Sequence, residues 1–219
     1  MIEAVIFDMD GVLVDSEPFW RTAMIKGFRE VGIDFTDEHC KSTTGMRFDE
    51  VVKYWHHRSP WTNKTTTEVE QGVLDHLCEL INEQGMPMPG ALEAITRFKS
   101  EGRKIGLATS SYNRLVDVIL TRLEARHHFH AIESAEHLEF GKPHPQVFLN
   151  CAAALGVKPE RCLVIEDSVN GVISAKAARM KVIAVPDPSD FYDPRFAIAD
   201  LKLNSLKELD PAILQQTFT

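Results

Sequence analysis

The sequence predicts an α/β protein whose core is a parallel sheet with helices on both faces, joined to a small all-helical cap. Two patterns support this fold class. From residue 89 onward, short continuous apolar runs alternate with segments whose apolar residues recur at helical spacing. Residues 17 to about 84 interrupt that alternation with helical patterns only. Because strands that are apolar at every position are buried on both faces, the first pattern indicates a parallel sheet between two layers of helices.

The predicted strands are short apolar runs, the first of which lies near residue 1. They are residues 3–7 (EAVIF), 104–108 (KIGLA), 129–134 (FHAIES), 162–166 (CLVIE) and 182–185 (VIAV). Helices are expected around Leu92, Ile95 and Phe98; around Leu115, Val118, Ile119 and Leu123; around Val147, Phe148, Cys151 and Leu155; and in a segment ending at Ala178. This alternation of strand and helix is the basis of the predicted parallel sheet.

Two apolar stripes at helical spacing define the inserted segment. Phe19, Trp20, Ala23, Met24, Phe28 and Val31 form the first stripe, and Val69, Val73, Leu77, Leu80 and Ile81 form the second. Turn-rich stretches at residues 15–18 and 85–90 mark the edges of the segment. We therefore expect a core domain formed by residues 1–15 and 86–219, with a helical cap domain at residues 16–85 inserted after the first strand.

Charge and composition narrow the class of function. The 219 residues carry a formal net charge of −8, which disfavours binding to nucleic acid or to an anionic membrane. Residues 1–20 lack the features of a signal peptide, and no run of about 18 apolar residues could span a bilayer. Four scattered cysteines form no C-x-x-C pair, which disfavours a zinc or redox motif. We expect a cytoplasmic protein without a nucleic-acid or membrane partner, and a monomer because a cap that opens and closes fits one.

Polar side chains follow several of the predicted strands at the point where each strand ends. Because parallel strands end at the same edge of a sheet, where open α/β folds bind ligands, these groups are expected to converge on one crevice. They are Asp8 and Asp10; Thr109, Ser110 and Ser111; Lys142; and Glu166 and Asp167.

This set of side chains suits a phosphate and a hard divalent cation. Crowded carboxylates repel one another, and Mg²⁺, which takes carboxylates and substrate phosphates as ligands, offsets that repulsion. Thr109 and the amides after it precede a helix that begins near Tyr112, an arrangement that binds anions, and Lys142 adds a positive charge. With a phosphate held there, an ionised aspartate can attack phosphorus and form an aspartyl-phosphate, while a second aspartate serves as general acid and base.

The same residues resemble four motifs of the haloacid dehalogenase superfamily. "DMDGVLVD" is similar to its D-x-D-G-x-x-x-D first motif, "LATS" to its second, "GKPHP" to its lysine motif and "IEDSVNG" to its acidic fourth motif. The resemblance implies a Rossmann-like core, an Mg²⁺ cofactor, Asp8 as nucleophile and Asp10 as acid and base. It further implies substrate contacts by Asp8, Met9, Asp10, Thr109, Ser110 and Lys142, and Mg²⁺ ligands from Asp8, the Asp10 carbonyl, Glu166 and Asp167.

Within the superfamily, "DSEPFW", "TGMR" and "KPHPQVFLNCAAALGV" resemble bacterial phosphatases of the 2-deoxyglucose-6-phosphatase or hexitol-phosphatase type. The implied reaction is hydrolysis of a small sugar or sugar-alcohol phosphate. Two enzymatic alternatives stay open: a β-phosphoglucomutase-type mutase, disfavoured because that branch carries a histidine where Trp20 stands, and a phosphoglycolate-type phosphatase. A phospho-signalling module is disfavoured because such domains are much shorter and place the phosphate-accepting aspartate on a middle strand.

Side chains of the cap are the candidates for contacts with the sugar. Glu17, Trp20 and Arg47 are such candidates, although a tryptophan on an apolar helical stripe is more often a core residue. Ser168 is expected to cap the helix that follows it. The histidines within residues 127–137 lack the spacing of a zinc site, so no zinc is expected there.

Overall fold

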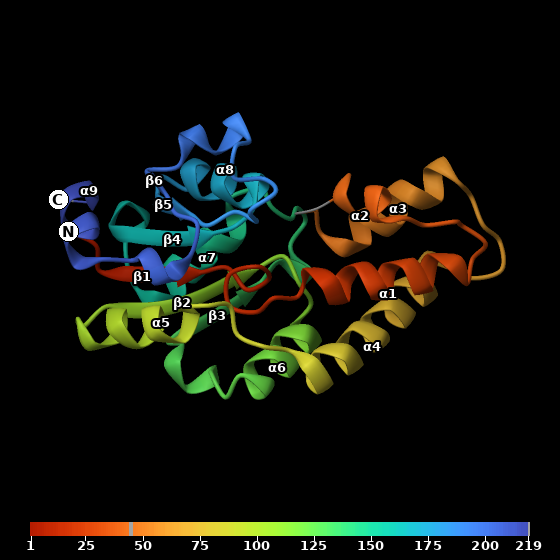
Figure 1. The fold of residues 1–219 in the computed structure, drawn as a ribbon, viewed down its shortest axis with the longest axis horizontal. Coiled ribbons are helices and arrows are strands. Elements are labelled where there is room, and N and C mark those ends of the chain that lie inside the picture. Colours follow the sequence, from red (N-terminus) through yellow and green to blue (C-terminus); the bar gives the residue numbers. More distant parts are fainter. Residues whose placement is uncertain (44–45, 219) are drawn as a thin grey trace.

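The computed structural model describes residues 1–43 and 46–218, with the side chains of residues 211, 213, 215 and 216 left out. Its centre is a six-stranded sheet, parallel throughout, with the strand order β3-β2-β1-β4-β5-β6 (Figure 1). β1 (Ala4–Phe7) is paired with β2 on one side and β4 on the other, so that Phe7 is level with both Leu107 and Ile165. The ends of the three central strands therefore meet at one edge, and the predicted fold class is confirmed.

All five predicted strands are present, with ends that differ from the prediction by at most two residues. A sixth strand, β6, was not predicted because two residues carry no periodic pattern. β3 and β6 form the two edges of the sheet, and their residues are only partly buried, unlike those of the central strands. The other strands are β2 (Lys104–Thr109), β3 (Ala131–Ser134), β4 (Cys162–Glu166), β5 (Lys181–Ala184) and β6 (Leu201–Lys202).

The helices fall into an inserted group and a group that packs on the sheet. The α-helices are α1 (Glu17–Arg29), α2 (Asp37–Lys41), α3 (Phe48–Arg58), α4 (Thr66–Gln84), α5 (Ala91–Ser100), α6 (Asn113–Arg122), α7 (Gln146–Leu155), α8 (Val169–Ala177) and α9 (Pro211–Phe218). Short 3-10 helices lie at η1 (Arg126–His128), η2 (Ala135–His137), η3 (Pro159–Arg161), η4 (Pro194–Ile198) and η5 (Leu206–Glu208). Among the described residues, no helix is long and apolar enough to cross a membrane.

The two faces of the sheet pack against different helices. Alternate residues of β1 point to opposite faces, so that Val5 and Phe7 belong to one apolar cluster and Ala4 and Ile6 to another. The first cluster includes buried residues of α5 and α6, and the second includes buried residues of α7 and α8. Helices therefore cover both faces of the sheet, as predicted.

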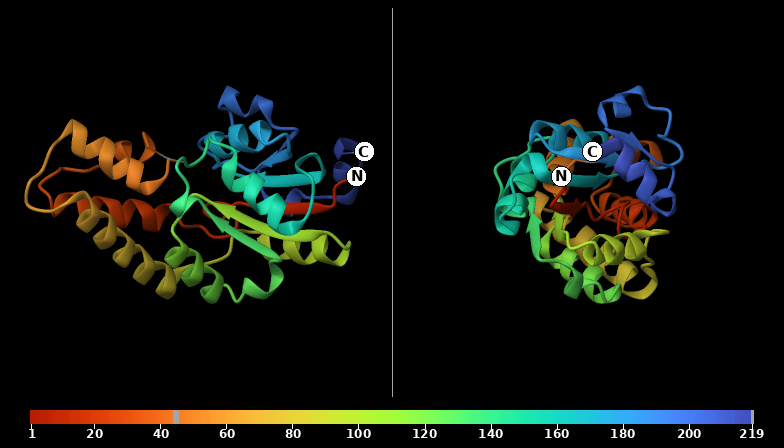
Figure 2. Two further views of the ribbon diagram at one scale, coloured as in Figure 1. Left: turned by 180° about the vertical axis from the view of Figure 1, so that it is seen from behind. Right: turned by 90° about the vertical axis from the view of Figure 1, so that its left-hand side faces the viewer.

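The inserted helices α1 to α4 lie beyond the carboxyl edge of the sheet, at the end of the molecule opposite the two termini (Figures 1 and 2). The two connections to them run side by side and antiparallel. Met88 N donates to Leu13 O at 2.9 Å, Asp15 N donates to Met86 O at 3.3 Å, and Val14 bridges to Pro87. The division into a core and a cap domain stays a prediction, and these paired connections are where it places the boundary.

Candidate active site

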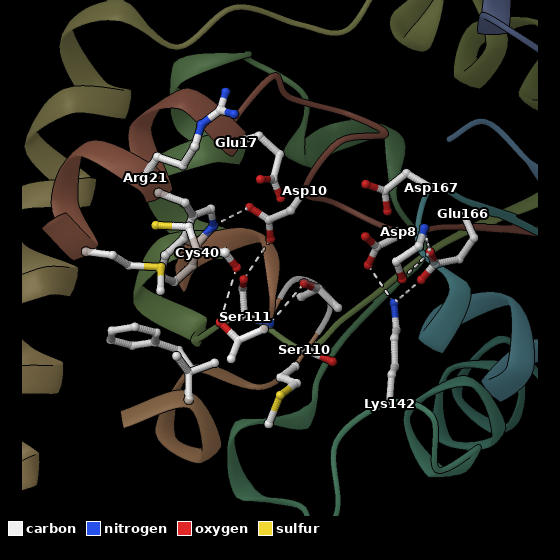
Figure 3. A pocket seen from close by; sticks show the side chains of 18 residues that line it. Asp8, Asp10, Glu17, Arg21, Cys40, Ser110, Ser111, Lys142, Glu166 and Asp167 are labelled. Carbon is white, nitrogen blue, oxygen red and sulfur yellow. Dashed lines mark hydrogen bonds and ion pairs between the residues drawn. The ribbon is translucent and has the colours of Figure 1, made fainter. Parts of the chain in front are cut away.

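A pocket lies at the carboxyl edge of the sheet, between the strand ends and the inserted helices (Figure 3). The structure brings all the predicted strand-end side chains to this pocket. From the sheet edge it is lined by Asp8, Asp10, Thr109, Ser110, Ser111, Lys142, Glu166, Asp167 and Ser168, and from the inserted segment by Glu17, Trp20, Arg21, Met24, Cys40, Thr43, Met46, Phe48 and Val51.

Lys142 lies at the centre of the buried charges. Its Nζ is 2.6 Å from Asp8 Oδ1 and 2.7 Å from Glu166 Oε1, and it also donates to the carbonyl of Ala108 at 3.0 Å. An ammonium group has three N–H donors, so these contacts use all of them. Lys142 is 5% exposed and Glu166 is fully buried. In this arrangement Lys142 holds Asp8 in place, and its predicted contact with a phosphate would have to share one of these donors.

The acidity of these groups reflects their burial and their crowding. Burial raises the pKa of Asp8 to about 7, against the opposing effect of Lys142 and with a further rise caused by Glu166 and Asp10. Burial and the charges of Glu166 and Asp8 hold the pKa of Asp167 well above its usual range. Burial alone would lower the pKa of Lys142, but the carboxylates of Asp8 and Glu166 outweigh it and raise that pKa. The site therefore has more negative charge than Lys142 offsets.

Three of these carboxylates lie close enough together to share one ion. Asp8, Glu166 and Asp167 each place an oxygen within 4.8 Å of the others, and within the described part of the chain they are the only such group of acidic, histidine or cysteine side chains. Asp167 accepts no hydrogen bond from another described residue. The side chain of Asp10 is not part of this group. The metal contact predicted for Asp10 from the sequence is through its carbonyl, and that assignment stays a prediction. The acidic cluster needed for a divalent metal is present.

Two glycines allow the backbone to approach these carboxylates. A Cβ at Gly11, whose φ is +72°, would lie 2.1 Å from Asp167 Oδ2, and a Cβ at Gly171 would lie 1.7 Å from Glu166 Oε1. Ser168 caps α8 by accepting from Gly171 N at 3.0 Å, and its Oγ also donates to Glu166 Oε2 at 3.0 Å. The predicted cap at Ser168 is therefore confirmed, and the same residue also orients Glu166.

Asp10 is held by three donors that come from different parts of the chain. Oδ1 accepts from Ser16 Oγ at 2.6 Å and from Trp20 Nε1 at 3.0 Å, and Oδ2 accepts from Ser111 Oγ at 2.7 Å. Trp20 is partly buried, and its ring packs against Phe48 at 5.1 Å between centroids. Trp20 therefore combines the apolar contacts expected of its stripe with a polar contact in the pocket.

The residues predicted to contact the phosphate differ in whether their side chains are available to a ligand. Thr109 Oγ1 is buried and accepts from Ser111 N at 3.0 Å, which forms the turn before α6. Ser110 Oγ is buried in the pocket lining with no hydrogen-bond partner among the described residues, so it is available to a ligand. The side chain of Met9 is fully buried in the apolar core and does not line the pocket. Any contact between Met9 and substrate would involve its backbone.

Arg47, a predicted sugar contact, does not line the pocket. Its guanidinium pairs with Asp49 at 2.5 Å and donates to the carbonyls of Ala135 and Leu138 at 3.1 and 2.6 Å, which joins the start of α3 to the loop that carries Lys142. Residues 44 and 45 of the "TGMR" motif lie outside the described residues. Of the histidines, His130 accepts from Ile105 N at 2.9 Å, which is a structural contact.

Glu17 and Trp20 were predicted from the sequence as candidate contacts, but Arg21 and Met24 were not, although α1 carries a signal for them. All four residues recur at the spacing of one helical face, and all four line the pocket. Ser16 and Ser111 precede or follow predicted elements, but no sequence pattern shows that both contact Asp10. Those contacts depend on how the inserted helices lie against the sheet.

Comparisons with known proteins agree with this geometry. A family model described as haloacid dehalogenase-like hydrolase matches residues 2–179. Hexitol phosphatase B of Escherichia coli is 45% identical over 209 residues, covering 95% of this chain and 94% of the relative. The structure of a β-phosphoglucomutase from Clostridium difficile superposes with a TM-score of 0.84 at 27% identity and covers 99% of this chain and 97% of its own.

A second solved structure is similar at the same level. CbbY of Rhodobacter sphaeroides, in complex with xylulose-(1,5)bisphosphate, superposes with a TM-score of 0.83 at 27% identity and covers 95% of this chain and 96% of its own. The family model spans most of the chain, and residues from all four of the sequence motifs described above line one pocket. This chain therefore belongs to the haloacid dehalogenase-like hydrolases, a family of enzymes.

Proposed function

We propose that this enzyme is an Mg²⁺-dependent phosphatase that hydrolyses a small sugar or sugar-alcohol phosphate through an aspartyl-phosphate on Asp8. The observation that carries the proposal is the different environment of two neighbouring aspartates. Asp8 Oδ1 is bound by Lys142, whereas Asp8 Oδ2 accepts no hydrogen bond from a described residue. Asp10, two residues later, has donors on both oxygens and lies outside the acidic cluster. One carboxylate is thus free to react, and the other is oriented by its neighbours. The identity of 45% to hexitol phosphatase B supports the substrate class.

The residues present fit a divalent cation. Three carboxylates, of which Asp8 and Glu166 are buried and Asp167 is partly buried, share only one ammonium group, and Asp167 has no hydrogen-bond donor among the described residues. Oxygen ligands of this kind suit Mg²⁺, which also takes substrate phosphate and water. Asp8, Asp167, Glu166 and the Asp10 carbonyl would hold the ion. When bound, it would offset the carboxylates and withdraw charge from the phosphoryl oxygens.

The residues of the chain then carry two linked transfers. Asp8 Oδ2 attacks phosphorus as the bond from phosphorus to the alcohol oxygen breaks, and Asp10 gives its proton to that oxygen. The alcohol leaves, and water attacks the phosphorus of the aspartyl-phosphate while Asp10 takes a proton from it. Inorganic phosphate leaves, Asp8 is restored and Asp10 is again protonated. Ser110 Oγ and the amides that follow Thr109 would bind the phosphoryl oxygens throughout.

Release of inorganic phosphate from a panel of esters tests this proposal. The panel contains sorbitol 6-phosphate, mannitol 1-phosphate, 2-deoxyglucose 6-phosphate, phosphoglycolate and 4-nitrophenyl phosphate. We expect activity with Mg²⁺, loss on chelation, and loss of at least about a thousandfold in kcat for Asp8→Asn. Asp15→Asn is the matched control, because Asp15 is exposed in the same segment and does not line the pocket. Full activity of Asp8→Asn would exclude Asp8 as the nucleophile.

A mutase is the second candidate, favoured by the TM-score of 0.84 to a β-phosphoglucomutase. A mutase would isomerise β-glucose 1-phosphate rapidly when primed with a hexose bisphosphate and would release inorganic phosphate slowly. Comparison of both rates in one reaction mixture separates the candidates. We expect phosphate release to be the faster reaction.

A further inference from the structure

Two charged side chains of α1 face the pocket. Glu17 and Arg21 lie four residues apart, which places them on one face of the helix about one turn apart, and both line the pocket. Figure 3 shows Arg21 on the far side of Asp10 from Lys142, with Glu17 beside Asp10. Neither side chain forms a hydrogen bond or an ion pair with another described residue. Both are therefore available to a ligand.

The pair offers complementary hydrogen-bonding groups. A carboxylate only accepts hydrogen bonds and a guanidinium only donates them, whereas a hydroxyl group does both. A carbon chain with neighbouring hydroxyl groups can satisfy Glu17 and Arg21 at the same time. Met24, Phe48 and Val51 line the same pocket and offer apolar contacts to the carbon atoms of such a chain.

The charges around the pair are unfavourable for a second phosphate group. Burial raises the pKa of Glu17, Asp10 raises it further, and Arg21 opposes both effects. Asp187, in the loop after β5, has a lowered pKa, mainly through hydrogen bonds from Ser189, with smaller contributions from Arg21 and Lys41. Arg21 therefore already lies near two carboxylates, Glu17 and Asp187. A dianionic phosphate beside Arg21 would be repelled by both of them.

Arg47 does not supply the missing positive charge. Its guanidinium is bound to Asp49 and to two backbone carbonyls outside the pocket. Among the described lining residues, Lys142 and Arg21 are thus the only lysine or arginine side chains, and Lys142 is already bound to Asp8 and Glu166.

We propose that Glu17 and Arg21 bind the hydroxyl groups of the leaving alcohol and thereby select a polyhydroxylated monophosphate over a bisphosphate. The inference rests on the proposed function, because the phosphoryl group must first be held at Asp8. It adds that the end of the substrate remote from the phosphoryl group is uncharged and rich in hydroxyl groups.

The test compares substrates with and without a second phosphate, and with and without hydroxyl groups on the leaving alcohol. Fructose 1-phosphate and fructose 1,6-bisphosphate differ by the second phosphate, and sorbitol 6-phosphate and 4-nitrophenyl phosphate differ in having or lacking hydroxyl groups. For the wild type we expect kcat/KM for the monophosphate to exceed that for the bisphosphate by about tenfold or more. Glu17→Gln should lower kcat/KM for sorbitol 6-phosphate about tenfold. It should also lower the ratio of kcat/KM for fructose 1-phosphate to kcat/KM for fructose 1,6-bisphosphate, because one charge that repels the second phosphate is gone.

Arg21→Met should lower kcat/KM for sorbitol 6-phosphate by a similar factor, about tenfold. Neither variant should change activity on 4-nitrophenyl phosphate, which also shows that each variant is folded. Lys26→Met is the matched control, since it removes a positive charge from an exposed position of the same helix. It should leave kcat/KM unchanged for both sorbitol 6-phosphate and 4-nitrophenyl phosphate.

Each possible outcome separates this inference from the proposed function. Equal wild-type activity on the monophosphate and the bisphosphate, or equal losses of the variants on sorbitol 6-phosphate and 4-nitrophenyl phosphate, would overturn the inference and leave the phosphatase in place. Absence of phosphate release from every ester, 4-nitrophenyl phosphate included, would overturn the proposed function itself.

Discussion

The indole nitrogen of Trp20 lies 3.0 Å from Oδ1 of Asp10 and joins a helix of the inserted segment to the loop after the first strand. Ser111, in the turn between β2 and α6, holds the other oxygen of Asp10 at 2.7 Å. Asp10 is therefore fixed between two parts of the chain that are far apart in sequence. Because an indole N–H can donate but cannot accept, Trp20 holds Asp10 only by donating to its carboxylate oxygen. The orientation of the proposed general acid depends on the position of α1.

Trp20→Phe should reveal this dependence through the leaving group. The variant keeps a ring against Phe48 and loses the N–H. We expect kcat/KM for sorbitol 6-phosphate to fall about tenfold, because its alkoxide needs a proton from Asp10, and to stay nearly unchanged for 4-nitrophenyl phosphate, whose phenolate does not. Trp61→Phe is the control, since the buried indole nitrogen of Trp61 has no described partner. Equal losses on both esters would argue against a role in orienting Asp10.

Removal of divalent metal should make the protein less stable at pH 8 than at pH 5. The pKa of Asp8 in the folded protein is about 7, against a reference value of 3.8. The folded state then binds the proton more tightly than the unfolded state, so this contribution to stability is complete below about pH 4 and is lost as the pH rises through about 7. We expect the free energy of unfolding in chelator to fall by on the order of 1–4 kcal/mol over that range.

Added Mg²⁺ should reverse this trend, because it binds the ionised carboxylates and competes with protons for them. Urea unfolding at pH 5 and pH 8, with chelator or with millimolar Mg²⁺, measures both effects. Asp8→Asn should reduce the pH dependence in chelator. A metal effect of the same size at both pH values would contradict the assignment of the acidic cluster as the metal site.

Gly171→Ala should disturb the acidic cluster through the backbone of α8. The added Cβ would lie 1.7 Å from Glu166 Oε1, so Glu166 and its partner Lys142 would have to move. We expect a loss of about 1–3 kcal/mol in the free energy of unfolding, together with weaker Mg²⁺ activation. Gly72→Ala is the matched control. It lies in α4 with nothing within 4 Å of its added Cβ, and it should stabilise the protein by up to about 1 kcal/mol. Unchanged Mg²⁺ activation in Gly171→Ala would contradict the predicted role of Glu166.

Arg47→Met should weaken the attachment of α3 to the sheet. The variant loses hydrogen bonds to the carbonyls of Ala135 and Leu138 and leaves Asp49 with Lys53 as its remaining partner. We expect a loss of about 2 kcal/mol in the free energy of unfolding, measured with urea. Arg161→Met, which removes an exposed pair with Glu3, should have little effect. Equal effects of the two substitutions would show that the contacts of Arg47 contribute no more than a surface ion pair.

Strand periodicity predicted the centre of the sheet well because β1, β2 and β4 are buried on both faces and read as continuous apolar runs. It failed at β6, because a strand of two residues is too short to show a periodic pattern. This strand is recognisable only from its pairing with β5 in the folded protein. The short helix α2 was not predicted for a similar reason, since five residues are too few to show a helical repeat.

The pocket was predictable to the extent that strand ends define it. Asp8, Lys142 and Glu166 meet because parallel strands end at one edge, which the order of the elements implies. The partners of Asp10 were not predictable in this way. Trp20 reaches Asp10 only because α1 packs at a particular angle over the strand ends, and helical periodicity gives the buried face of a helix but not its angle to a neighbouring sheet.

The pairing of residues 13–15 with residues 86–88 has a consequence for evolution and engineering. The chain leaves the sheet and returns to it at the same place, so the intervening 70 or so residues form an insertion whose two ends lie side by side. Such an insertion can be shortened, or exchanged for one of a different length, at low cost in chain entropy. The cost is low because the paired connections already hold its two ends together. The sheet and its carboxylates can thus be retained while the inserted helices that line the pocket are replaced as a unit.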